Sequence, residues 1–119
     1  MSRYAHIPIF QKTYQLTLIV YKAADNFKKA HKYTLGEKLK NICGELLDLI
    51  VAVNGAENKK EPLERLDLKL ETLRIHLRLA YDLKIVSPGL LGELNKAIEE
   101  IGRQIGGLKK WTEVKISER

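Results

Sequence analysis

Cysteine is almost absent from this chain of 119 residues, in which Cys43 is the only one. A single cysteine excludes an internal disulfide, and no cluster of His and Cys has the spacing of a zinc site. The fold must therefore depend on its apolar core, and a chain of this length is long enough to bury one. Unpaired cysteine is typical of a reducing compartment, so we expect a cytoplasmic protein.

Long apolar runs are missing too. The densest stretch covers residues 16–20, and Thr17 interrupts it. A membrane-spanning helix needs about 20 consecutive apolar residues, so we expect no membrane partner. Residues 1–6 contain no apolar segment of the kind found in secretory signals, so we expect no such signal.

Residue patterns that support catalysis are also scarce. The three histidines His6, His31 and His76 are widely separated in the sequence. A dimetal bundle needs Glu-x-x-His pairs on facing helices, and the chain has none. Cys43 lies beside an apolar stripe, which favours a buried structural thiol over a nucleophile. We predict no catalytic site, no metal and no cofactor.

Four segments have the apolar period of an α-helix, at about residues 9–29, 34–54, 63–84 and 88–110. No segment has a convincing strand pattern. Helices of similar length joined by short connections predict an up-down-up-down antiparallel four-helix bundle. We therefore expect an all-α fold with residues 1–119 in a single domain.

Several boundary signals accompany these periods. Thr34 and Glu37 have the spacing of a capping box and predict the start of the second helix, after a polar loop at residues 28–32. Beyond Trp111 we expect a frayed tail. The other signals are Asn54-Gly55 as a helix end, Pro62 in a first turn, and Ser87-Pro88 as an N-cap followed by proline.

The first and third segments each carry two apolar stripes. In the third, one seam is continuous, and Leu68, Ile75 and Leu79 form a second strip on the nearly opposite side. This strip indicates either self-association or deep burial within one chain. The third-segment seam consists of Leu63, Leu66, Leu70, Leu73, Leu77 and Ala80. The first-segment stripes consist of Phe10, Tyr14, Leu18 and Tyr21, and of Leu16, Ile19, Val20, Ala23 and Phe27.

Basic residues exceed acidic ones, 21 to 15, which gives a net charge of +6. Such an excess favours polyanionic partners such as nucleic acid or an acidic protein face. Arg74 and Arg78 lie four residues apart and share a helix face, where they form either ion pairs at a subunit contact or a patch for phosphates. The other candidate binding residues are Arg65 and Lys69 as a second pair, and Lys28, Lys29, His31, Lys32 and Lys38 as a cluster around the first connection.

Four segments, taken together and in order, resemble the accessory variability determinant (Avd) proteins of diversity-generating retroelements. Related four-helix-bundle proteins are encoded in intervening sequences of ribosomal RNA genes. The matching segments are IFQKTY at residues 9–14, HKYTLGEKL at 31–39, LRIHLRL at 73–79 and IGRQIGG at 101–107. The ribosomal branch typically carries Asn-Ile-Ala-Glu-Gly in its second helix. This chain has Asn-Ile-Cys-Gly-Glu at residues 41–45, which favours the Avd-like branch.

The resemblance implies a pentameric barrel with a basic surface, which binds the retroelement's reverse transcriptase and associates with RNA or DNA during mutagenic retrohoming. Arg74 and Arg78 match the arginines of the family's third-helix motif, so the resemblance gives them a partner-binding role. Arg103, in the last matching segment, joins the candidate binding residues. The alternative is a structural protein of the ribosomal type with no role in nucleic-acid binding.

Overall fold

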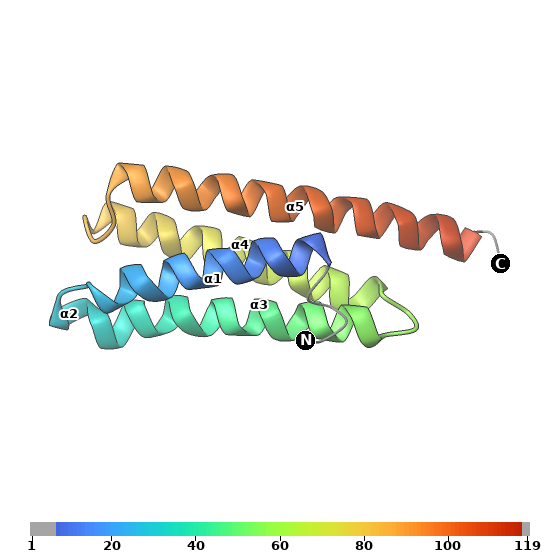
Figure 1. Ribbon diagram of the computed structural model, residues 1–119, viewed down its shortest axis with the longest axis horizontal. Helices are drawn as coiled ribbons and strands as arrows, with labels where there is room; N and C mark the ends of the chain where they lie inside the picture. The colour runs from blue at the N-terminus through green and yellow to red at the C-terminus, as the bar shows by residue number, and fades with distance from the viewer. Residues whose placement is uncertain (1–6, 118–119) are drawn as a thin grey trace.

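The computed structural model describes residues 7–117. Its long helices are α1 (Pro8–Asp25), α3 (Glu37–Gly55), α4 (Lys60–Asp82) and α5 (Pro88–Ser117). Successive long helices run in opposite directions (Figure 1). Residues 7–117 contain no strand, so the predicted all-α fold of four helices is confirmed.

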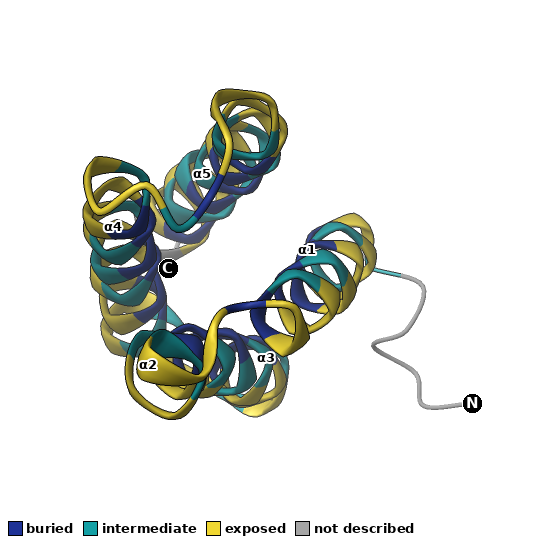
Figure 2. Ribbon diagram, turned by 90° about the vertical axis from the view of Figure 1, so that its left-hand side faces the viewer, coloured by how far each residue is buried: buried dark blue, intermediate teal, exposed yellow. Residues whose placement is uncertain are grey.

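Each helix has two neighbours in this arrangement. α1 packs against α3 and α5, and α4 packs against the same two helices. α1 and α4 therefore occupy opposite corners of the bundle, as the end view shows (Figure 2). The outer faces of these two helices point away from each other, which becomes important for the candidate binding surfaces.

The core is built from one apolar stripe on each long helix. The predicted seam of α4, from Leu63 to Ala80, is buried along its whole length. Full burial of a leucine contributes about 1.5–3 kcal/mol, whereas an exposed ion pair contributes about 0–1 kcal/mol. The apolar seams, and not the surface charges, therefore stabilise the fold. The facing core residues include Leu16 and Val20 of α1, Leu39, Ile42, Leu46 and Leu49 of α3, and Leu94, Ile98, Ile101 and Ile105 of α5.

The connection between α1 and α3 differs from the sequence prediction. The first helix ends at Asp25, and of the loop predicted at residues 28–32 only Lys28 is non-helical, because a short helix α2 (Lys29–His31) leads into a π-helical turn, η2 (Lys32–Gly36). The predicted cap at Thr34 is wrong. Its Oγ1 lies within η2 and donates to the carbonyls of Ala30 and His31 at 3.5 and 3.3 Å.

Packing against the core explains this connection. Phe27 is buried beneath it, and Gly36 is buried beside Phe27. A Cβ atom on Gly36 would lie only 3.3 Å from Phe27 Cδ2 and 3.4 Å from the carbonyl oxygen of His31. The chain therefore stays helical and passes close to Phe27, so its backbone N–H groups are satisfied without a side-chain cap.

The other helix ends follow the sequence more closely. α3 ends at Gly55 as predicted, and Ser87 Oγ accepts a hydrogen bond of 3.1 Å from the N–H of Leu90 at the start of α5. The predicted frayed tail after Trp111 is wrong, because α5 continues to Ser117 and buries Thr112. With 30 residues α5 is longer than the 19-residue α3, and it extends past the other helices (Figure 1).

α4 ends in a Schellman motif that places a lysine in a left-handed conformation. The N–H of Ile85 donates to the carbonyl of Ala80 at 2.8 Å, and the N–H of Lys84 donates to that of Tyr81 at 2.9 Å. Lys84 has a φ angle of 62°, in the region that glycine usually occupies at this position. A side chain with a Cβ is strained there.

Replacing Lys84 by glycine should therefore stabilise the protein by about 1 kcal/mol, because the Cβ strain disappears. Urea unfolding followed by circular dichroism measures this change. Lys84→Ala is the matched control, since it removes the same charge and keeps the Cβ, and it should give little gain. Equal stabilisation by both variants would attribute the effect to charge and contradict the backbone explanation.

Candidate partner-binding surfaces

The outward face of α4 carries an apolar strip. Leu68 and Ile75 are 71% and 60% exposed, and Leu79 is also exposed. Leu83, after the end of α4, is exposed as well. Residues 68–83 would span about 22 Å along a helix axis. Deep burial of this strip within one chain is therefore contradicted, and we call Leu68, Ile75, Leu79 and Leu83 the α4 strip.

A second exposed strip lies on α1. Tyr14, Leu18 and Tyr21 are exposed, and the Phe10 and Tyr14 rings stack with centroids 5.9 Å apart. We call these four residues the α1 strip. The sequence showed two stripes on this helix but did not decide which one faces the core. The α1 strip lies on the flank of α1 beside α3, where Lys40 Nζ is 5.2 Å from the centroid of the Tyr21 ring. One bundle therefore presents two apolar strips, on helices at opposite corners.

Arg74 and Arg78 flank the α4 strip, and both have acidic neighbours on the same helix. The Nε of Arg74, which is half-buried, lies 3.5 Å from Glu71 Oε2 without forming a hydrogen bond. The exposed Arg78 donates from Nε to Asp82 Oδ1 at 3.0 Å. That bond uses Nε, and the Arg78 side chain is 70% exposed, so another acceptor can reach the guanidinium. The predicted intrahelical ion pairing is present, and the charges also remain at the edge of the apolar strip.

Arg65 and Lys69, the second pair of basic residues predicted on α4, differ in their contacts. Arg65 is exposed and forms no ion pair within residues 7–117. Lys69 forms an ion pair with Glu45 of α3, and Lys109 of α5 forms one with Asp67 of α4 at 2.8 Å. Lys69 therefore links two helices of the bundle, and of this pair only Arg65 is left open to a partner.

The predicted lysine cluster gathers at one end of the bundle. Lys28, Lys29 and Lys38 are exposed, and His31 and Lys32 are half-buried, all on or beside α2 and η2. Residues 26–36 contain no acidic residue. The acidic residue immediately before this segment is Asp25, whose pKa is lowered chiefly by a hydrogen bond of 2.7 Å from Lys40. Glu37 follows the segment directly, but Lys28, Lys29, Lys32 and Lys38 outnumber the acids, so this connection is basic.

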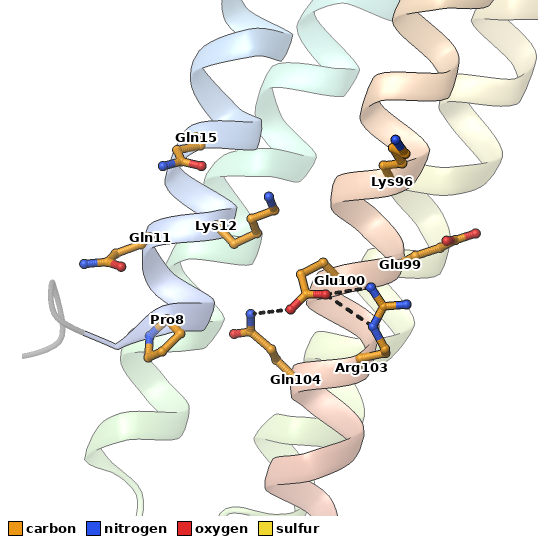
Figure 3. Close-up of a pocket in the computed structure, with 9 residues that line it drawn as sticks. All are labelled: Pro8, Gln11, Lys12, Gln15, Lys96, Glu99, Glu100, Arg103 and Gln104. Carbon is orange, nitrogen blue, oxygen red and sulfur yellow. Dashed lines mark hydrogen bonds and ion pairs between the residues drawn. The ribbon is translucent and has the colours of Figure 1, made fainter.

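Arg103 belongs to a third surface, a groove of about 520 Å³ between α1 and α5 (Figure 3). Its Nη2 donates to Glu100 Oε2 at 2.6 Å, and Gln104 donates to the other carboxylate oxygen at 3.3 Å. Both hydrogen bonds lower the pKa of Glu100, and the bond from Arg103 has the larger effect. Lys12 and Lys96 supply the other positive charges of the groove. The structure therefore does not bring Arg103 together with Arg74 and Arg78.

A family model described as bAvd-like matches residues 7–112. The chain belongs to the bAvd-like family. The match covers α1 to α4 completely and most of α5, which confirms the resemblance drawn from the four sequence segments. A comparison with functionally described proteins gave no match.

In this bAvd-like chain, His76 is a half-buried residue of α4. His76 Nδ1 lies 2.8 Å from the carbonyl oxygen of Thr72 on its own helix, and His6 lies outside the described residues. No group of three or more metal-ligating side chains occurs within residues 7–117. The same part of the chain contains no helix that is both long and apolar enough to span a membrane.

Cys43 is fully buried, as the sequence predicted. Burial raises the pKa of its thiol to about 12, and a hydrogen bond with Thr17 offsets part of this rise. The thiolate is the reactive form, so the folded protein holds this group unreactive at neutral pH. The pKa of the thiol is higher in the folded protein than the ordinary value of 9.0, so with rising pH the unfolded chain loses this proton before the folded one does. The free energy of unfolding should therefore fall as the pH rises above 9.0.

We expect a disulfide reagent such as 5,5′-dithiobis(2-nitrobenzoate) to modify Cys43 at pH 8 at least about 100-fold more slowly in the native protein than in urea, because the thiol is both buried and protonated. Absorbance of the released thiolate gives both rates. A native rate within about tenfold of the unfolded rate would contradict the buried, protonated state.

Proposed function

We propose that this chain is a non-enzymatic accessory protein of a diversity-generating retroelement. It assembles into a homo-oligomer, a pentamer by family resemblance, and binds reverse transcriptase and nucleic acid through basic residues in the cytoplasm. The observation that carries the proposal is the outward face of α4, where an exposed apolar strip is flanked by Arg74 and Arg78. Membership of the bAvd-like family and the net charge of +6 support it.

The two apolar strips suggest how copies associate. A contact between the α1 strip of one copy and the α4 strip of the next joins two different surfaces, which is a head-to-tail interface. Such interfaces close into rings when the rotation between copies allows it. Exposed apolar patches of this kind are typical of protein interfaces, and the aromatic rings of Tyr14 and Tyr21 suit such a contact.

Assembly would also multiply the basic residues. Each copy contributes its own arginines beside the α4 strip and its own lysines at the α2–η2 end. Repeated weak attractions to one polyanion combine through their effective concentration, so a ring binds far more tightly than a single copy. This supports a role for the net charge beyond keeping the protein in solution.

One observation favours a second candidate, a scaffold protein without nucleic-acid binding. Arg74 and Arg78 each have an acidic neighbour, Glu71 and Asp82, on their own helix. In that case the arginines would only stabilise α4 and its contacts between copies. Replacing them would then disturb assembly instead of removing a partner.

Ile75→Glu tests the assembly. The side chain is exposed in the bundle, so the variant should fold, but a carboxylate in the apolar contact should shift the protein from oligomer to monomer. Sedimentation velocity measures the size, and circular dichroism checks the fold. Val51→Glu, at an exposed apolar position on α3 outside both strips, is the matched control and should stay oligomeric. A monomeric wild-type protein, or an Ile75→Glu variant of unchanged size, would contradict the proposal.

The double variant Arg74→Ala with Arg78→Ala tests partner binding. We expect affinity for the proposed partner, a reverse transcriptase of a diversity-generating retroelement, to fall at least about tenfold while the oligomer persists, because charge pairs across an interface are lost. Pull-down and sedimentation are the measurements. Lys60→Ala with Lys110→Ala removes the same charge from exposed positions elsewhere and should bind normally. Loss of the oligomer without selective loss of the partner would favour the scaffold function.

A further inference from the structure

Tyr33 is an exposed aromatic residue that belongs to neither apolar strip. It lies on η2 and is 66% exposed, second only to Leu68 among the exposed large apolar side chains. Tyr14 and Tyr21 belong to the α1 strip, which the proposed assembly covers. Tyr33 instead lies at the end of the bundle, where the short connection joins α1 to α3 (Figure 1).

Lysines lie on both sides of Tyr33 in the sequence, and one of them contacts its ring. Lys32 Nζ lies 6.0 Å from the ring centroid, within the range of a cation–π contact. Lys28, Lys29 and Lys38 are exposed nearby in the sequence and form no ion pair within residues 7–117. Asp25 is already engaged by Lys40. The ring therefore has one lysine in contact and three more exposed lysines close by in the sequence, whereas Glu37 is the one acidic residue between residues 26 and 38.

An exposed aromatic ring among lysines has the chemistry of a single-strand binding site. Unpaired bases stack on aromatic side chains, while nearby cations contact the phosphates. The bases of a duplex are already stacked on each other, so a duplex would use the lysines alone. An acidic protein face would also use only the charges. The exposed ring is the feature that favours a single strand.

We propose that the α2–η2 end binds single-stranded RNA or DNA, with Tyr33 stacking on one base and Lys28, Lys29, Lys32 and Lys38 contacting phosphates. This inference rests on the nucleic-acid binding of the proposed function, and it specifies where on the bundle the strand binds and how its bases are held. The π-helical turn has a role here, because it presents Tyr33 to solvent while Gly36 packs inward against Phe27.

The test uses the full-length protein and labelled oligonucleotides of about 12 nucleotides, as single-stranded RNA, single-stranded DNA and duplex DNA, in fluorescence anisotropy at about 50 and 200 mM salt. Tyr33→Leu keeps an apolar side chain without a ring, and Tyr33→Phe keeps the ring. We expect Tyr33→Leu to weaken single-strand binding about 5- to 100-fold, with duplex binding and the salt dependence unchanged. Tyr33→Phe should bind like the wild type. The RNA and DNA arms show which strand is preferred.

Two further measurements identify the mode of binding. Quenching of 2-aminopurine in the bound strand reports stacking, and it should disappear in Tyr33→Leu. Lys28→Ala with Lys29→Ala should weaken single-strand and duplex binding alike and reduce the salt dependence, because phosphate contacts are lost. Sedimentation should show the same oligomer for every variant.

The outcomes separate the two proposals. A wild-type protein that binds neither single strand nor duplex at low salt overturns nucleic-acid binding as a whole. If the wild type binds and Tyr33→Leu binds equally well, the stacking role is wrong and the proposed function stands. Equal weakening of single-strand and duplex binding, or a change of oligomer size in Tyr33→Leu, would make Tyr33 a structural or interface residue and also overturn the inference.

Discussion

A helix that is apolar on two sides can bury only one of them within its own bundle, and this constraint shapes the whole molecule. α4 packs its leucine seam inward, which leaves Leu68, Ile75 and Leu79 in solvent. α1 meets the same constraint at the opposite corner. Each leucine left outside forgoes part of the about 1.5–3 kcal/mol that full burial contributes, so the folded chain keeps a tendency to bury these strips against another surface.

Much of the fold follows from local sequence patterns. The spacing of Leu63 to Ala80 places one seam of α4 in the core because helical geometry repeats every 3.6 residues. The helix end at Gly55 and the cap at Ser87 also depend on neighbouring residues alone, and both were predicted. Helical spacing also predicted the second strip on α4. Only the packing of the four helices shows that this strip is exposed and not buried.

The features that the sequence did not reveal depend on tertiary packing. The connection from α1 to α3 is helical from Lys29 onward, where Gly36 fits closely against Phe27, a contact that no local signal reports. The ion pair of Lys69 with Glu45 joins α4 to α3, and that of Lys109 with Asp67 joins α5 to α4. The two residues of each ion pair lie far apart in the sequence. For this reason the sequence predicted a binding role for Lys69, whereas in the structure Lys69 links two helices. Tyr33 was not among the predicted binding residues, because it belongs to none of the apolar stripes with helical spacing.

The two ends of the bundle differ. At one end are α2 and η2 with their lysines, and α5 extends beyond the other end (Figure 1). In a closed ring all copies point the same way along one axis. Every lysine-rich end would then lie on one rim, and every extended helix on the other. Such a ring would have two different faces, so a molecule that approached along the axis would meet lysines on one face and extended helices on the other.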